Sequence, residues 1–224
     1  TLGQCMKHET GIPDLISEDR FYLAVLNNPN KKWGPEELLE YIYDKPAEFA
    51  AGDTAVYSNT NTVLVTMIIE AQTGKRHAQL LHDYVLKPLG LNNTYYQPHD
   101  ALPSFTAQGY YDLYNNGSIV NVSNLVTGSG NGYGGLYSNI YDLYAFMDAM
   151  FIRGNFLLPS SQAIMKTWGK KDDTNYYGYG IQQSYIRGND FGIGHKGRDL
   201  GYSANAFYFP SKGVTHIFFV NYGT

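Results

Sequence analysis

The spacing of hydrophobic positions predicts helices in the first two thirds of the chain. From residue 60 onward, apolar side chains recur every three or four positions, and Gly74 is well placed to end that helix. A second periodic stretch follows Asn139, a suitable N-terminal cap with Asp142 in the first turn, and Gly154 is expected to end it. Shorter helices are expected from Pro35, over residues 76–86 before Pro88, and over residues 161–168.

The C-terminal part of the chain has a different pattern, which predicts antiparallel strands. Strands are expected over residues 191–195, 203–209 and 215–221. The last two are joined by Pro210-Ser211-Lys212-Gly213, a sequence typical of a hairpin turn. Loops are expected at Thr10-Gly11-Ile12-Pro13-Asp14 and over most of residues 92–134, which lack apolar periodicity. Long loops of this kind often carry function.

Together these elements predict an α+β fold in one domain over residues 1–224. A mainly helical lobe is expected at about residues 15–170, and an antiparallel sheet flanked by helices at about 176–224. No covering element follows the last predicted strand, so one face of the sheet would lie bare. We therefore expect the domain to be incomplete at both ends.

Composition excludes several functional classes. Hydrophobic residues make up 43% of the chain and charged residues 16%, as in folded globular proteins. The net charge of −4, without a lysine and arginine cluster, disfavours a nucleic-acid partner. Cys5 is the only cysteine, so no internal disulfide or cysteine-based metal site is expected. No apolar run approaches the ~20 residues of a membrane span, and residues 1–5 do not resemble an export signal.

Four motifs follow one another in an informative order. Tyr57-Ser58-Asn59 stands at the start of the helix predicted from residue 60. Lys87-Pro88-Leu89-Gly90-Leu91-Asn92-Asn93-Thr94 comes about thirty residues later, and Gly134-Gly135-Leu136-Tyr137-Ser138-Asn139 precedes Asp142-Leu143. Gly194-His195-Lys196-Gly197 lies on a predicted strand. Each motif is weak alone, but four in order resemble the serine β-lactamase and penicillin-binding-protein superfamily, which includes class C β-lactamases, D-Ala-D-Ala carboxypeptidases and esterases.

The resemblance implies a role for each matched position. Tyr57 would shuttle a proton between a serine and the leaving group, with its pKa lowered by neighbouring positive charge. Asn59 would orient a lysine and hold the substrate's acyl amide, and His195 would lie beside the leaving group. Gly197, which has no Cβ, would let substrate lie along the strand. The backbone N–H of Arg198 would be one donor of the oxyanion hole.

The nucleophile of that superfamily is missing from this sequence. It stands in a Ser-x-x-Lys motif, yet no serine here has lysine three residues later; Ser17 and Ser184 have arginine at that position. Residues 4–14 are similar to the family segment that follows the motif, so we expect the nucleophile upstream of Thr1 and the 224 residues alone to be inactive.

The implied activity is acyl-enzyme hydrolysis of an amide or ester, such as a D-amino-acid peptide, a β-lactam or a small ester. The alternative is a non-catalytic module that binds peptide or peptidoglycan on the same fold. Both interpretations imply a small-molecule or peptide ligand and an extracytoplasmic location, periplasmic or secreted. The hydrolase interpretation requires Tyr57 and His195 to meet in a cleft between the lobes.

Other motifs give weaker signals. The remaining histidines lack the spacing of paired metal ligands, so we expect structural or surface roles for them and no metal or cofactor; these are His8, His77, His82, His99 and His216. The glycine-rich segment at residues 132–135 has no following phosphate-loop lysine, and residues 201–205 lack the second glycine of a nucleophile elbow.

Overall fold

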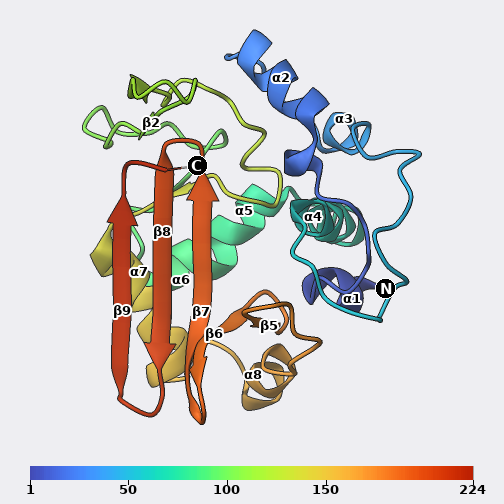
Figure 1. Ribbon diagram of the computed structural model, residues 1–224. Coiled ribbons are helices and arrows are strands. Elements are labelled where there is room, and N and C mark those ends of the chain that lie inside the picture. Colours follow the sequence, from blue (N-terminus) through green and yellow to red (C-terminus); the bar gives the residue numbers. More distant parts are fainter. Residues whose placement is uncertain (224) are drawn as a thin grey trace.

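A computed structural model describes residues 1–223. Helices occupy the first two thirds of the chain and a five-stranded antiparallel sheet occupies the end, as expected for an α+β fold (Figure 1). The helices are α1 (Leu2–Met6), α2 (Asp19–Asn27), α3 (Pro35–Leu39), α4 (Asn59–Thr73), α5 (His77–Leu81), α6 (Lys87–Leu89), α7 (Ile140–Met147) and α8 (Pro159–Met165). A 3₁₀ turn, η1 (Leu15–Ser17), and two π-helical segments, η2 (His82–Leu86) and η3 (Asp148–Ile152), extend them.

The predicted ends of the two long helices are confirmed. Gly74 ends α4 with a φ of 65°, a left-handed conformation that glycine adopts without strain. Asn139 caps α7, because its side-chain Oδ1 accepts a hydrogen bond of 2.8 Å from the backbone N–H of Asp142. Both helices therefore begin and end where side-chain chemistry satisfies the unpaired backbone groups.

One prediction about helices was wrong, and one longer helix was missed. Pro88 does not end the helix that begins at His77; the helix continues through η2 and α6 to Leu89, and Gly90 ends it with a φ of 66°. The wider π-helical turn of η2 lies directly before the proline, where a regular α-helical turn would bring the ring against a carbonyl. Helix α2 was not predicted, although Phe21 and Val25 are spaced for one buried helical face.

The sheet has the strand order β5-β6-β7-β8-β9, with every neighbouring pair antiparallel. Its strands are β5 (Tyr176–Tyr177), β6 (Gln182–Arg187), β7 (Asp190–Asp199), β8 (Tyr202–Phe209) and β9 (Val214–Val220). The predicted hairpin joins β8 to β9, and Gly213 there has a φ of 62°. Strand β7 runs to Asp199, four residues beyond its predicted end, and β5 and β6 were not predicted.

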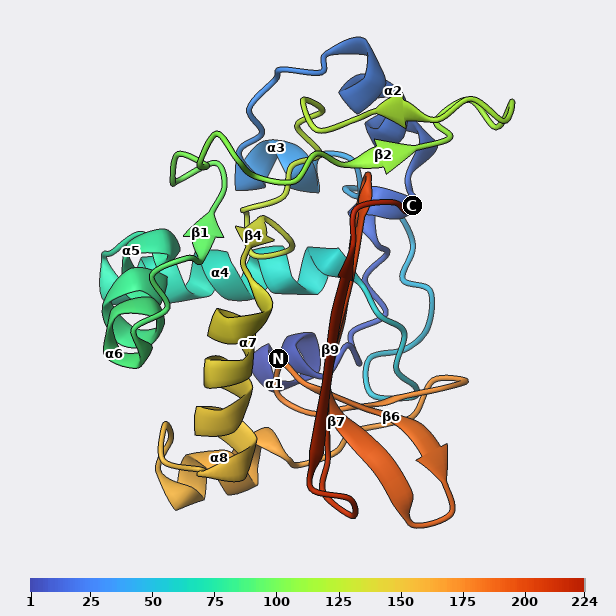
Figure 2. The ribbon, with the colours of Figure 1, turned by 90° about the vertical axis from the view of Figure 1, so that its left-hand side faces the viewer.

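Residues 92–134 form the expected loop-rich excursion, with only short strand pairs. In this region β1 (Tyr95–Tyr96) pairs with β4 (Leu136–Tyr137), and β2 (Tyr110–Tyr111) pairs with β3 (Val120–Asn121). Helix α7 packs against β8 and β9, which Figure 2 shows with the sheet nearly edge-on. Within residues 1–223, no helix lies over the opposite face, which is toward the viewer in Figure 1.

Two hydrophobic clusters form the core, one in each lobe. The cluster of the helical lobe consists of Leu15, Phe21, Val25, Trp33, Leu38, Leu39, Val63 and Tyr133. The cluster beside the sheet consists of Met150, Met165, Ile181 and Ile193. In the part of the chain that the structure describes, no helix is long and apolar enough to cross a bilayer.

Candidate active site

The start of α4 is fixed against the loop of residues 10–14. Thr60 Oγ1 donates a hydrogen bond of 2.7 Å to the Pro13 carbonyl oxygen and accepts one of 3.0 Å from the Leu15 backbone N–H. The loop can turn this closely because Gly11 has a φ of +74°; a Cβ there would lie 2.1 Å from the Phe49 carbonyl oxygen. Two segments separated by about 45 residues therefore meet in one rigid platform.

Asp14 and Asn59 form the polar centre of this platform. Asp14 Oδ1 accepts a hydrogen bond of 3.0 Å from the backbone N–H of Asn59, and its Oδ2 accepts one of 2.9 Å from Asn59 Nδ2. Burial raises the pKa of Asp14, although these hydrogen bonds act in the opposite direction. Among residues 1–223 nothing donates a hydrogen bond to Asn59 Oδ1, so this oxygen can accept one from a ligand.

Tyr57 lies directly before this platform and contacts three aromatic side chains. Its ring centroid is 4.2 Å from that of His8, 6.0 Å from that of Tyr177 and 5.8 Å from that of His195. The structure therefore brings together the two residues that the sequence predicted to meet, Tyr57 from the helical lobe and His195 from the sheet.

The lowered pKa expected for Tyr57 belongs to a site that includes the motif lysine, so it stays a prediction. Burial raises the pKa of the phenol to about 12, and the nearby Asp14 carboxyl adds to the increase. The expectation of a lowered pKa relied on the lysine of the Ser-x-x-Lys motif, which is not among these 224 residues. Tyr57 is therefore a protonated phenol in this chain near neutral pH.

His8 is a site residue whose position the sequence analysis missed. Its side chain is buried, and its Nδ1 accepts a hydrogen bond of 3.2 Å from the backbone N–H of Ser58. Burial lowers the pKa of His8 to about 4. The only sequence signal was its place three residues before Gly11, in the segment that resembles the family.

His195 lies on β7 at the point where the strand loses one neighbour. Strand β6 pairs with β7 only as far as Gly194, whereas β8 pairs with β7 through Asp199. Beyond Gly194, one edge of β7 is therefore free, and this edge lies on the side of α4 and α1 (Figure 1). His195 Nδ1 lies 2.5 Å from the Lys196 carbonyl oxygen, and burial lowers the pKa of His195.

The free edge of β7 presents backbone donors. The Lys196 N–H donates a hydrogen bond of 3.2 Å to Gln182 Oε1, so this N–H points away from β8. Because backbone groups of a strand alternate between its two edges, the N–H of Arg198 points to the same free edge. Gly197 lies between them, and a Cβ there would meet only the Ala204 Cβ, at 3.4 Å.

Asp199 ends β7 and is held by the loop before β4. Its Oδ1 accepts a hydrogen bond of 2.9 Å from Thr127 Oγ1, and its Oδ2 accepts one from Ser129 Oγ. Burial raises the pKa of this carboxyl. No sequence motif drew attention to Asp199, because the predicted strand ended at His195.

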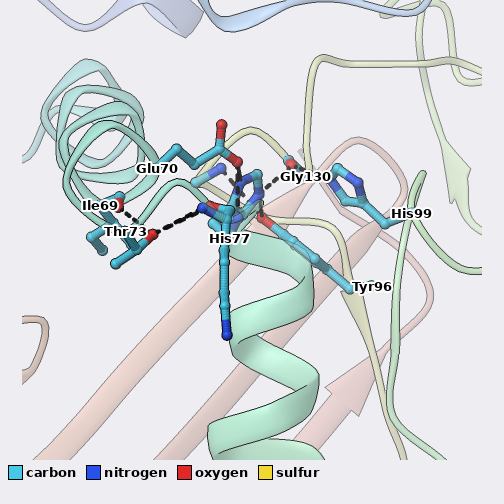
Figure 3. Close-up of polar contacts among 9 residues, drawn as sticks. Ile69, Glu70, Thr73, His77, Tyr96, His99 and Gly130 are labelled. Atoms are coloured by element: carbon cyan, nitrogen blue, oxygen red, sulfur yellow. Dashed lines mark hydrogen bonds and ion pairs between the residues drawn. The ribbon is translucent and has the colours of Figure 1, made fainter.

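A second polar cluster lies between α4, α5 and the same loop (Figure 3). His77 Nδ1 lies 2.5 Å from Glu70 Oε1, and its Nε2 lies 3.0 Å from the Tyr96 hydroxyl and 3.1 Å from the Gly130 carbonyl oxygen. His99 Nε2 also contacts that carbonyl, at 2.9 Å. His77 and His99 therefore have the structural role that was expected, and they fix the backbone next to Ser129.

Within residues 1–223, His, Cys, Asp and Glu side chains do not gather in groups of three that could hold a metal ion. His82 is instead engaged with Asp100, whose Oδ2 lies 2.9 Å from His82 Nε2. The candidate site consists of the Tyr57 phenol, the imidazoles of His8 and His195, the Asn59 amide and the unpaired backbone edge of β7. Such groups can relay protons and stabilise an oxyanion.

Comparisons with known proteins agree with one another. The family model described as Beta-lactamase matches residues 1–224. An Escherichia coli O157:H7 protein provisionally named as a D-alanyl-D-alanine carboxypeptidase is 24% identical over 201 residues, which are 76% of this chain and 46% of that protein. The chain thus spans about half the length of the curated relatives of this kind that it matches.

Solved structures have the same fold. A D-stereospecific amidohydrolase from Streptomyces sp. superposes with a TM-score of 0.88 at 26% identity, over 99% of this chain and 68% of that one. The D-amino acid amidase of Ochrobactrum anthropi SV3, in complex with L-phenylalanine amide, superposes with a TM-score of 0.84 at 22% identity, over 99% of this chain and 64% of that one.

Proposed function

Because the chain belongs to the beta-lactamase family, we propose that it carries most of the active site of a serine hydrolase that cleaves amides or esters through an acyl-enzyme. The single observation that supports this most strongly is the meeting of Tyr57 and His195 at the free edge of β7. Catalysis by this mechanism requires a nucleophilic serine, which we propose is supplied by a Ser-x-x-Lys segment outside the 224 residues.

In the proposed reaction the serine oxygen attacks the substrate carbonyl carbon. The backbone N–H of Arg198 stabilises the oxyanion that forms, and the bond between carbon and the leaving nitrogen or oxygen then breaks. Tyr57 passes the serine's proton to the leaving group, and water hydrolyses the resulting ester. The lysine of the motif would lower the high pKa of the Tyr57 phenol through its positive charge.

The remaining site residues have roles that fit their contacts. Asn59 keeps its Nδ2 on Asp14, and its Oδ1 is available to the motif lysine or to a substrate amide N–H. His195 is neutral near pH 7, because burial lowers its pKa, so it acts as a polar neighbour of the leaving group. Gly197 leaves room for substrate along the strand edge.

The names of the similar proteins suggest the first substrates to test. They include a D-stereospecific amidohydrolase and a D-amino acid amidase. We therefore propose amides of D-amino acids and D-amino-acid peptides as substrates, ahead of β-lactams and small esters. We also propose an extracytoplasmic location, which rests on the family resemblance alone.

The alternative function is a non-catalytic module that binds peptide or peptidoglycan at the same site. The observation that favours it is that Asn59 Oδ1 and the unpaired edge of β7 beyond Gly194 can bind a peptide without any nucleophile. The two functions differ in one property, the capacity to form a covalent acyl-enzyme.

Covalent labelling tests the proposal. Protein that includes the proposed Ser-x-x-Lys segment is incubated with a fluorescent penicillin or an alkyl phosphonate, and the adduct is located by peptide mass spectrometry. We expect one adduct, on the serine of that segment, and none in the Ser→Ala variant. A protein that binds the penicillin reversibly but forms no adduct with either reagent would support the binding module instead.

A further inference from the structure

Asp199 lies on the same face of β7 as His195. Side chains of a strand alternate between its two faces, and the pairing of β7 with β8 continues without a bulge from Ile193 to Asp199. His195, Gly197 and Asp199 therefore share one face, and the middle residue has no side chain. The two outer Cα atoms are about 13 Å apart at ~3.3 Å per residue.

The carboxylate of Asp199 has no cationic partner among residues 1–223. Its hydrogen bonds come from neutral groups, namely the hydroxyls of Thr127 and Ser129 and the Leu200 backbone N–H at 2.8 Å. The neighbouring cation Lys196 belongs to the other face of the strand, where its Nζ lies 5.1 Å from the centre of the Tyr185 ring. A partly buried negative charge without a counter-charge favours binding of a cation.

Two aromatic rings lie close to Asp199. Tyr202 is its cross-strand partner, and the ring of Tyr202 lies edge-to-face with that of Tyr137, 5.5 Å between centroids. The charge of Asp199 contributes, after burial and Tyr202, to raising the pKa of Tyr137. Carboxylates combined with aromatic rings suit ammonium groups, which interact favourably with both.

The surroundings of Asp199 are held in place before any ligand binds. The Gly130 carbonyl oxygen, one residue from Ser129, is held by His77 and His99 (Figure 3). Gly134 approaches so closely that a Cβ there would lie 3.2 Å from Asp199 Oδ2 and 2.8 Å from Ser129 Oγ. A carboxylate fixed in this way can orient a ligand at little entropic cost.

We propose that Asp199 is a specificity residue that binds a primary ammonium group on the acyl portion of the substrate. This inference rests on the proposed hydrolase function, in which the leaving group lies beside His195 and the carbonyl oxygen beside the Arg198 N–H. The acyl portion then extends past Arg198 toward Asp199. The ammonium group is either the free α-amino group of an amino-acid amide or an amine at the end of its side chain.

Three amides test this inference in protein that includes the Ser-x-x-Lys segment. D-alanine amide carries only an α-amino group, N-acetyl-D-lysine amide carries only a side-chain amine, and N-acetyl-D-alanine amide carries neither. We expect Asp199→Asn to lower kcat/KM about 10- to 100-fold for one of the two amines, as for loss of a hydrogen bond to a charged group. The uncharged amide should change by less than about threefold, and the amine that is affected identifies the source of the ammonium group.

Two control variants separate charge recognition from structural support. Asp190→Asn removes a carboxylate from the half-buried start of β7, where Asp190 pairs with Lys212, and should leave all three values unchanged. Ser129→Ala removes a hydrogen bond from Asp199 but keeps the charge, so it should lower thermal stability without changing the preference for the amine. Equal losses on all three amides in Asp199→Asn, or no loss on any, would overturn the inference.

A binding measurement distinguishes this inference from the proposed function. If wild-type protein hydrolyses none of the amides, the hydrolase proposal fails. Equilibrium binding of the same three compounds, followed by intrinsic fluorescence, then decides the role of Asp199. At least tenfold weaker binding of one amine by Asp199→Asn supports recognition of the ammonium group, and unchanged binding contradicts it.

Discussion

At the scale of single residues, the notable feature of the site is that its titratable rings are neutral. Tyr57 lies between His8 and His195, and burial raises the pKa of the phenol and lowers the pKa of both imidazoles. None of these three groups therefore supplies the charge that a phenolate would need. In the proposed reaction this charge has to come from the lysine of the Ser-x-x-Lys segment.

Replacing Tyr57 by phenylalanine removes the proton relay and keeps the ring. We expect Tyr57→Phe to lower the rate of serine acylation by about 10² to 10⁴-fold, the usual contribution of a general acid or base. Thermal stability should change little, because the contacts with His8 and Tyr177 remain. The measurement is the second-order rate of labelling by fluorescent penicillin. Tyr84→Phe, at an exposed tyrosine of η2, is the control, and a normal rate in Tyr57→Phe would exclude the relay.

The buried His8 makes a specific prediction about stability and pH. Its pKa is about 4 in the folded chain, against 6.5 for the free side chain. The unfolded chain therefore takes up a proton first, so the contribution of His8 is complete above pH 6.5 and is lost as the pH falls toward 4. The loss is up to about 3 kcal/mol, at about 1.4 kcal/mol per unit of pKa.

Urea unfolding between pH 7 and pH 4 measures this contribution. In His8→Asn, whose amide oxygen can take the place of Nδ1 as an acceptor for the Ser58 N–H, the decrease with falling pH should be shallower than in the wild type. His216→Gln, at an exposed position on β9, should follow the wild-type curve. If the wild type and His8→Asn lose stability in parallel, His8 does not stay neutral in the fold.

The sequence predicted the meeting of Tyr57 and His195 because both belong to motifs whose order matches a family. It did not predict the place of His8 or the pairing of Asp14 with Asn59. Those contacts join residues about 45 to 50 positions apart, and local spacing carries no information about them. The lowered pKa of Tyr57 stays a prediction for a site with the motif lysine, because in this chain burial and the Asp14 carboxyl raise it to about 12 and that lysine is not among the 224 residues.

At the scale of elements, the two halves of strand β7 differ in how many neighbouring strands they pair with, and therefore in what they can do. Up to Gly194 it is paired on both sides, and beyond that residue only β8 remains. The first half therefore stabilises the sheet, and the second half leaves backbone groups available to a ligand. Two glycines, Gly194 and Gly197, lie on either side of this change.

Alanine substitutions at these two glycines should have different effects, one on stability and the other on acylation. In Gly194→Ala the new Cβ would lie 1.9 Å from the Ala206 carbonyl oxygen, so β7 and β8 must separate. We expect a loss of about 3 kcal/mol or more in the free energy of unfolding. In Gly197→Ala the nearest atom is 3.4 Å away, so stability should change by less than about 1 kcal/mol.

Gly197→Ala should nevertheless impair acylation, because its methyl group would project from the face of β7 next to the edge along which substrate is proposed to lie. Thermal unfolding and the rate of penicillin labelling, measured on both variants, check the two expectations. A Gly197→Ala variant with normal stability and a normal labelling rate would show that substrate does not approach β7 at this position.

Elements with strong local signals, such as α4, α7 and the hairpin of β8 and β9, were predicted, whereas segments that only pairing makes into strands were not. Gly74 and Asn139 end and begin their helices through local backbone geometry and hydrogen bonding, which do not depend on the rest of the fold. The second half of β7 is polar and charged, from Lys196 to Asp199, and it is a strand only because β8 pairs with it. Pro88 was wrongly predicted to end its helix, because the π-helical turn that accommodates it has no recognised sequence signal.

At the scale of the whole molecule, the two lobes are joined by many contacts between distant segments. The Lys170 N–H donates a hydrogen bond of 2.6 Å to Glu9 Oε1, and Thr127 and Ser129 donate to Asp199. The Tyr110 N–H also donates to the carbonyl oxygens of Gly201 and Asn221. These contacts come from three separate parts of the chain. We therefore propose that residues 1–224 behave as one domain, as the sequence analysis expected.

The two tryptophans of the chain allow this proposal to be tested, because each belongs to a different core. Trp33 lies in the cluster of the helical lobe, and Trp168 packs against the cluster beside the sheet. In Trp168→Phe, fluorescence excited at a wavelength selective for tryptophan reports on the helical lobe, and in Trp33→Phe it reports on the sheet side. For one cooperative unit, each fluorescence transition in urea should coincide with the far-ultraviolet circular dichroism transition of the same variant.

Comparing the two probes within each variant removes the effect of the substitution on stability. This matters because Trp33 Nε1 donates a hydrogen bond to the Val126 carbonyl oxygen, which Trp33→Phe removes. A fluorescence midpoint clearly separated from the dichroism midpoint, in either variant, would mean that the lobes unfold independently.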